Sequence, residues 1–235
     1  MVELRKPSED KNVVMMLYGP TGVGKTTFAS TMPSPVILSI EKGDESLVDT
    51  PLGDLKSVAD IHTIEEFNEA WQNIVNGEWG DKFDSVVIDS LTEFQERLMD
   101  RILEEQGKNY PTIREWGIAK QRLLRMIRNM KDLGMNLLFI CAEKEENSEG
   151  IVCKRPSLTG GDMPQRIGAN CDIVGYYSAE QNEQGDLDRK IFVEPDIRFY
   201  AKHRLGEHLD SPIKPDFEVI SNAIEERREN RDGEE

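Results

Sequence analysis

Eight consecutive residues, Gly19–Thr26, have the types and spacing needed to hold phosphate groups. They fit the pattern G-x-x-x-x-G-K-[ST] at every required position. In such a turn, successive backbone N–H groups point at phosphate oxygens, and glycine lets the backbone approach without a Cβ in the way. Lys25 is expected to reach the β and γ phosphates, and the Thr26 hydroxyl to ligate Mg²⁺. The pattern predicts ATP or a close relative as ligand, with Mg²⁺, bound by Gly19, Pro20, Thr21, Gly22, Val23, Gly24, Lys25, Thr26 and Thr27.

A site of this kind needs a carboxylate near the metal ion, usually at the end of a buried strand. Asp89 directly follows the apolar run Val86–Ile88, so Thr26 and Asp89 are the predicted metal ligands. The next residue is Ser90, where many helicases and AAA+ motors carry a water-activating glutamate. Glu41, at the tip of the strand after the phosphate-binding turn, is the alternative candidate for orienting the attacking water.

These residues require a particular arrangement of strands and helices. Apolar runs at residues 12–18, 35–40, 84–89 and 136–142 predict buried strands, and residues with helical spacing lie between them. This alternation predicts an α/β fold with three layers, in which helices cover both faces of a mostly parallel sheet. Beyond residue 142 the short segments 151–154, 172–178, 190–193 and 198–202 look like hairpins added to the same sheet.

The predicted organisation is a single domain with short ends. Residues 1–11 form an N-terminal extension, residues 12–215 form the nucleotide-binding domain, and residues 216–235 form an acidic, frayed tail. No run is long and apolar enough for a membrane span, and the N-terminus lacks the apolar stretch of a signal peptide. We therefore expect a cytoplasmic protein with no membrane partner, whose three cysteines are reduced and structural.

The charge of the chain is unevenly distributed. A formal net charge of −16 argues against binding nucleic acid with the whole surface. Between Gly107 and Lys131, however, seven basic residues face one acid, Glu115. A local basic patch is therefore compatible with the sequence, although such a run is also typical of a solvated helix face.

The chain resembles the RecA-like P-loop proteins, and more narrowly the phage nucleotide-binding proteins related to RecA, which are proposed to be single-strand annealing recombinases. The resemblance rests on the turn at Gly19, on Glu41 and on the run VVIDSLTEF. It continues through Arg114-x-Trp116-Gly117, the strand LLFICAEKE, the turn Leu158–Gly160 and the segment Tyr200–Arg204, and so covers residues 12–225. It implies an AAA/RecA-related ATPase with a RecA-like core.

The resemblance also implies roles for individual residues. Glu41 becomes the catalytic glutamate, and Lys202 and Arg204 match a K-x-R pair that reaches the nucleotide of the adjacent subunit. Positive charge delivered there would stabilise the transition state and couple hydrolysis to assembly. Glu143 occupies the position of a polar sensor, often histidine, and an acid there would repel a γ-phosphate unless it binds a cation or Lys144.

Mobile loops carry the nucleic acid in RecA-like proteins, and the matching segments here are residues 107–116 and 145–166. The candidate DNA-binding residues in them are Lys108, Arg114, Lys154, Arg155 and Arg166. Tyr110 adds an aromatic ring of the kind that stacks on single-stranded bases. The implied partners are single-stranded DNA, further copies of the chain in a ring or filament, and a single-strand binding protein. A phage-encoded protein of this kind would act in DNA recombination in the bacterial host cytoplasm.

Two other functions remain open on the sequence. A small-molecule or nucleotide kinase would bring an arginine-rich lid over the phosphates, and segment 145–166 could be such a lid. A nucleotide-gated recombination mediator or loader would bind ATP with little turnover, which Glu143 at the sensor position would explain. A GTPase is disfavoured, because the segment Glu143–Glu146 lacks the asparagine of N-K-x-D and Thr92 stands at the glycine position of D-x-x-G.

Overall fold

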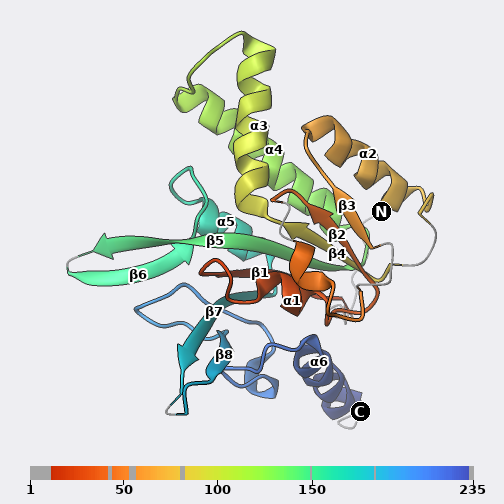
Figure 1. The fold of residues 1–235 in the computed structure, drawn as a ribbon, viewed down its shortest axis with the longest axis vertical. Helices are drawn as coiled ribbons and strands as arrows, with labels where there is room; N and C mark the ends of the chain where they lie inside the picture. Colours follow the sequence, from red (N-terminus) through yellow and green to blue (C-terminus); the bar gives the residue numbers. More distant parts are fainter. Residues whose placement is uncertain are drawn as a thin grey trace.

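A mostly parallel sheet forms the centre of the molecule (Figure 1). The computed structural model describes residues 12–41, 44–52, 57–79, 83–148, 150–182 and 184–232. Within these ranges the strands lie in the order β3 (Val58–Asp60), β2 (Pro35–Ser39), β4 (Ser85–Asp89), β5 (Asn136–Ser148), β1 (Val14–Gly19), β7 (Ile173–Gln181) and β8 (Leu187–Phe192), and β6 (Ile151–Pro156) pairs with β5. Neighbours in this order are parallel except β7 and β8, and β6 runs antiparallel to β5.

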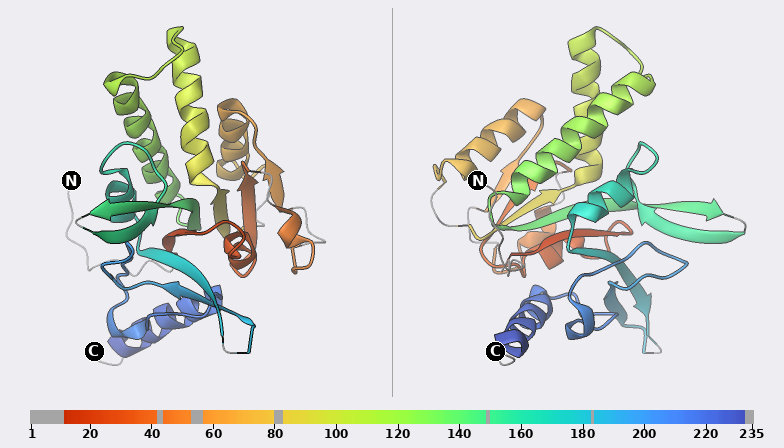
Figure 2. Two further views of the ribbon diagram at one scale, coloured as in Figure 1. Left: turned by 60° about the vertical axis from the view of Figure 1, so that its left-hand side comes forward. Right: turned by 180° about the vertical axis from the view of Figure 1, so that it is seen from behind.

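Helices cover both faces of the sheet and confirm the predicted three-layer α/β architecture. They are α1 (Lys25–Ala29), α2 (Ile64–Val75), α3 (Leu91–Gln106), α4 (Ile113–Lys131), α5 (Met163–Asn170) and α6 (Phe217–Asp232), with short 3₁₀ turns η1 (Asp44–Leu47) and η2 (Gly206–His208). Figures 1 and 2 show α2, α3 and α4 on one side of the sheet and α1 and α6 on the other. In the part of the chain that the structure describes, no helix is long and apolar enough to cross a membrane.

Two separate apolar cores lie on the two faces of the sheet, because side chains alternate along a strand. In β1, Met16 and Tyr18 face the core beneath α2–α5, whereas Met15 and Leu17 face the core beneath α1 and α6. The strand is therefore apolar throughout its length, as expected for a parallel strand covered on both sides. The polar residue Asp89 is the last residue of β4, and β1 and β4 end at the same edge of the sheet.

The C-terminal strands differ in part from the predicted hairpins. β8 does form a hairpin with β7, and β6 forms one with β5 that projects from the sheet in Figure 1. β7 itself, however, pairs in parallel with β1 and so belongs to the central sheet. Residues 198–202 form only isolated bridges, at Phe199 and Lys202. Apolar content predicts that such a segment is a strand, but it carries no information on the direction of its partner.

The sequence predicts a frayed acidic tail over residues 216–235, but residues 217–232 form the helix α6, and its first turns pack against the domain. Phe217, Ile220 and Ala223 are buried in the core beneath α1, and the Phe217 N–H donates a 2.9 Å hydrogen bond to the Thr31 Oγ1. These apolar positions follow helical spacing, but the surrounding charged residues obscured them in the sequence. The start of α6 is therefore part of the domain. The predicted N-terminal extension, residues 1–11, lies outside the described residues.

The junction between α3 and α4 is a capped helix start rather than a long loop. Thr112 and Glu115 form a capping box, so α4 begins at Ile113, earlier than the sequence suggested. The Glu115 side chain is fully buried and accepts hydrogen bonds from the Thr112 N–H (2.9 Å) and the Lys108 ammonium group (2.7 Å). These hydrogen bonds, of which the one from Lys108 has the largest effect, hold the pKa of Glu115 at about 2.

We predict that Glu115→Gln destabilises the protein more at pH 7 than at pH 3. A carboxylate with a lowered folded-state pKa contributes stability above its unfolded pKa, near 4.5, and loses it as the pH falls towards 2. Urea unfolding of the wild type and the variant at both pH values measures the difference. Glu69→Gln, on the exposed face of α2, is the matched control. An equal loss of stability at both pH values would contradict the prediction.

Candidate functional site

The phosphate-binding turn connects the buried strand β1 to α1 at the carboxyl edge of the sheet. Gly24 has a φ angle of +110°, a left-handed conformation that side chains disfavour. Gly19 lies so close to β7 that a Cβ atom there would be 2.3 Å from the Tyr177 carbonyl oxygen. Both positions therefore need glycine, for different reasons. The backbone follows the path that the sequence pattern predicts between a strand and a helix.

Lys25 lies at the start of α1 and points back over the turn. Its ammonium group donates hydrogen bonds of 2.8 Å to the carbonyl oxygens of Gly19 and Pro20. Burial lowers the pKa of Lys25, while the carboxylates of Asp89 and Glu41 act in the opposite direction. A partly desolvated cation is thus held beside the turn, where it would interact strongly with phosphate oxygens.

Thr26 and Asp89, the two predicted metal ligands, lie in direct contact. The Thr26 Oγ1 donates a 2.6 Å hydrogen bond to the Asp89 Oδ2. The contact forms because β1 and β4 both run parallel to β5 and end at nearly the same level along it, with Gly19 opposite Ala142 and Asp89 opposite Ile140. A hydroxyl and a carboxylate are the oxygen donors that Mg²⁺ prefers, and this ion typically takes its remaining ligands from phosphates and water. The residues therefore fit Mg²⁺, although no group of three or more His, Cys, Asp or Glu side chains among the described residues forms a metal site by itself.

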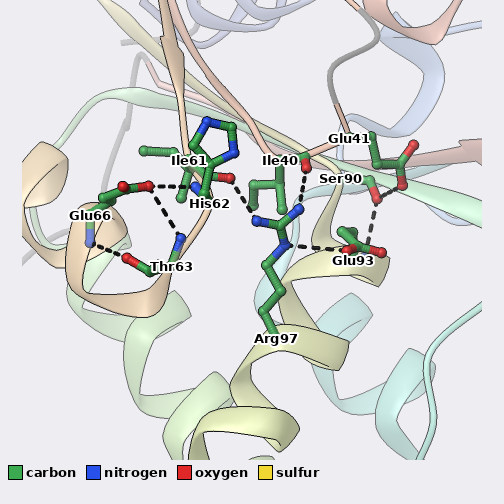
Figure 3. A network of polar contacts seen from close by, with 9 residues as sticks. All are labelled: Ile40, Glu41, Ile61, His62, Thr63, Glu66, Ser90, Glu93 and Arg97. Carbon is green, nitrogen blue, oxygen red and sulfur yellow. Dashed lines mark hydrogen bonds and ion pairs between the residues drawn. The ribbon is translucent and has the colours of Figure 1, made fainter.

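Glu41 is oriented by the residue that follows Asp89. The Ser90 hydroxyl donates a short hydrogen bond to the Glu41 Oε1 and also accepts the Glu93 N–H as the N-cap of α3, as Figure 3 shows. The Glu41 backbone is fixed too, because its N–H donates to the Asp89 carbonyl oxygen. In the sequence, Ser90 is notable only because it stands where other families carry a glutamate. In the structure, it holds the candidate base Glu41 at the same edge of the sheet as Thr26 and Asp89.

Arg97 of α3 forms hydrogen bonds with the backbone at this edge of the sheet (Figure 3). Its guanidinium donates to the carbonyl oxygens of Ile40 (2.8 Å) and Ile61 (3.0 Å), at the ends of β2 and β3, and to the Glu93 carboxylate. Ile40 directly precedes Glu41. One side chain therefore connects α3 to the ends of two strands next to the candidate catalytic glutamate.

A cavity of about 640 Å³ opens above the turn. Its lining includes most of the predicted nucleotide-binding residues together with Glu41, Asp89 and Ser90. It also includes residues that the sequence did not indicate, among them Tyr177 of β7, Arg189 of β8 and Pro215 before α6. No local pattern marks Tyr177 or Arg189, because only the pairing of β7 with β1 and with β8 brings them to the turn.

The structure places the other predicted site residues away from this cavity. Lys202 donates to the Cys171 carbonyl oxygen (2.8 Å), and Arg204 pairs with the Asp172 carboxylate (3.1 Å). Glu143 lies one position beyond Ala142, which lines the cavity, so its side chain leaves β5 on the opposite face. Its carboxylate is 3.7 Å from the Lys154 ammonium group. The sequence suggests Lys144 as its partner, but Lys144 pairs with Glu146.

The candidate DNA-binding residues are distributed over the α3–α4 junction, α4, β6 and α5. Lys108 is held by Glu115 at the α3–α4 junction, and Arg114 is exposed in the first turn of α4. Lys154 and Arg155 lie on β6, which pairs with β5 in a hairpin where a mobile loop was expected. Arg166 lies on α5 and pairs with Asp162. The structure does not bring these five residues into one site.

We predict that Ser90→Ala lowers the turnover of bound nucleotide by about 10- to 100-fold, because a freed Glu41 carboxylate loses its alignment with the attacking water. Nucleotide affinity should change little. Ser90 also caps α3, so loss of its hydroxyl costs about 1 kcal/mol of stability as well. Ser90→Thr keeps the hydroxyl and should retain most of the turnover. Single-turnover kinetics and thermal unfolding separate the two effects, and unchanged turnover in Ser90→Ala would contradict the role of the serine.

Comparison with known proteins identifies the kind of domain. The family model described as "AAA domain" matches residues 11–205. No curated protein gives a match. Among solved structures, the crystal structure of the flagellar accessory protein FlaH from Methanocaldococcus jannaschii is similar, with a TM-score of 0.43 and 9% identity over 77% of this chain and 76% of that chain. A likeness at this level carries no argument about function.

Proposed function

Since the chain belongs to the AAA domain family of P-loop ATPases, we propose that it binds and hydrolyses ATP with Mg²⁺. We further propose that ATP hydrolysis drives its action on single-stranded DNA, in recombination or strand annealing. The observation that supports hydrolysis is the convergence of Lys25, Thr26, Asp89 and Glu41 on one cavity. The DNA role is suggested by the sequence resemblance and by a basic groove described below.

Each residue of the cavity has a distinct chemical task in this proposal. Backbone N–H groups of residues 19–26 and the Lys25 ammonium hold the β and γ phosphates. Thr26 and Asp89 would hold Mg²⁺, which neutralises phosphate charge when bound. The Glu41 carboxylate, held by Ser90, orients the attacking water and accepts its proton.

The described residues that suggested the two alternative functions, a kinase and a mediator with little turnover, do not line the nucleotide cavity. Segment 145–166 could have been the lid of a kinase, but none of its described residues lines the cavity. Glu143, which suggested a binding module with little turnover, is absent from the lining too. Assembly into a ring or filament, with Lys202 and Arg204 at the junctions, stays part of the proposal. Both side chains are partly accessible on the surface of the chain.

We predict that Lys25→Ala lowers ATP hydrolysis by about 100- to 1,000-fold, since it removes a cation aimed at the developing phosphate charge. Phosphate release, measured with and without single-stranded DNA, tests this. Lys144→Ala is the matched control, because Lys144 lies on β5, pairs with Glu146 and does not line the cavity. A Lys25→Ala variant as active as the wild type would overturn the proposed function.

A basic groove between α4 and α5 supports the nucleic-acid part of the proposal. It has a volume of about 410 Å³ and is lined by Gly117, Lys120, Gln121, Leu124, Arg125, Arg128 and Arg166. Asp162 pairs with Lys120 and Arg166. Arg125 and Arg128 are exposed and form no ion pair within the described part of the chain. Cations without carboxylate partners, on a chain of net charge −16, are suited to a phosphodiester backbone.

We predict that the double variant Arg125→Gln/Arg128→Gln weakens binding to an oligothymidylate and makes it less dependent on salt. Each lost phosphate contact should reduce the slope of log K against log salt by about 0.7, so two contacts reduce it by about 1.4. Fluorescence anisotropy over a range of salt concentrations measures both quantities. The control Lys190→Gln/Arg198→Gln removes the same charge from β8 and the segment after it. Equal slopes for the two double variants would rule out the groove as the contact surface.

A further inference from the structure

Arg189 is a second cation in the lining of the nucleotide cavity, besides Lys25, although it lies 166 residues after Val23 of the phosphate-binding turn. It lies on β8, and its Nε donates a 3.1 Å hydrogen bond to the carbonyl oxygen of Val23, inside the phosphate-binding turn. A Cβ atom at Gly24 would be 3.7 Å from the same Nε and 3.0 Å from the Tyr177 hydroxyl oxygen. The guanidinium therefore lies beside the point where α1 begins.

The position of Arg189 follows from the register of the hairpin. Tyr177 pairs with Ile191 and Ala179 pairs with Arg189, so these four residues share one face of the β7–β8 ladder. Tyr177 and Ile191, at one end of that face, are buried in the core beneath α1, and Arg189, at the other end, is exposed. Since β7 is the parallel neighbour of β1, this face carries Arg189 to the phosphate-binding turn.

The contact with Val23 fixes the arginine without occupying its outer donors. Only the Nε is used, and the two terminal nitrogens have no hydrogen-bond or ion-pair partner among the residues that the structure describes. The four remaining N–H groups form the planar fork that binds phosphate with two parallel hydrogen bonds. The side chain is thus anchored and still able to take a ligand.

The charges that line the cavity point to the same role. Its charged lining residues are Lys25 and Arg189, which are positive, and Glu41 and Asp89, which are negative. Without Arg189 the lining would carry a net negative charge, which opposes a polyphosphate. Lys202 and Arg204, the cations that the resemblance assigns to a neighbouring subunit's nucleotide, do not line this cavity in their own chain.

We propose that Arg189 binds the phosphates of the nucleotide held by its own chain. The inference rests on the proposed nucleotide binding and deepens it, because it assigns part of the phosphate charge compensation to the same subunit. Two charge-assisted hydrogen bonds are lost when the side chain is truncated, so Arg189→Ala should weaken ATP affinity by about 10- to 100-fold.

The first test compares affinities for a fluorescent ATP analogue with Mg²⁺ in the full-length protein. Arg189→Ala should show the stated loss, and Arg189→Lys, which keeps a charge without the fork, should lie between it and the wild type. Lys190→Ala is the matched control: it removes the same charge one residue away, on the opposite face of β8, and should bind as the wild type does. Thermal unfolding confirms that each variant is folded. An Arg189→Ala variant that binds as tightly as the wild type overturns this inference alone, whereas a wild type that binds no nucleotide overturns the proposed function as well.

A mixing experiment tests whether the arginine acts within its own chain. Lys25→Ala has a defective cavity and an intact Arg189, and Arg189→Ala has the reverse. If Arg189 acts within its own subunit, mixing the two variants should leave the weak affinity of Arg189→Ala unchanged at every protein concentration. Recovery of affinity in the mixture would mean that the arginine serves a neighbouring subunit, and would overturn the proposal.

Discussion

The site depends on the alignment of parallel strands at one edge of the sheet. The hydrogen bond from Thr26 to Asp89, 2.6 Å long, joins a helix start after β1 to the end of β4, although 62 residues separate them in the chain. It can form only because β5 lies between β1 and β4 and all three run in the same direction. Parallel pairing thus converts distant sequence positions into one group of oxygen donors beside the phosphate-binding turn.

A layer of backbone and side-chain contacts keeps that group in place. Ser90 holds the Glu41 carboxylate, and Arg97 ties the carbonyl oxygen of Ile40 to α3. Asp89 is the last residue of β4, and Glu41 follows the end of β2 by two residues, so both candidates lie close to strand ends that α3 contacts. The same geometry explains why a serine after Asp89 is compatible with hydrolysis: the carboxylate comes from the adjacent strand.

Charge is distributed unevenly over this molecule. The chain is strongly acidic as a whole, yet cations gather at the nucleotide cavity and in the groove between α4 and α5. In the cavity they are balanced by Glu41 and Asp89, which suits a ligand that is bound together with a divalent metal ion. In the groove Arg125 and Arg128 have no such balance, which suits a ligand whose charge is uncompensated.

The sequence by itself determined the phosphate-binding turn, Asp89 and the layered α/β class, because each depends on local spacing or on runs of apolar residues. The sequence also proposed Glu41 as a candidate, and Glu41 lines the cavity, while its catalytic role stays a prediction. Only the tertiary structure decided that Arg189 and Tyr177 reach the turn, that Glu143 leaves β5 on the other face, and that Phe217 packs into the core. These outcomes follow from strand direction, register and side-chain alternation. Such properties arise from pairing between distant segments, and no local pattern encodes them.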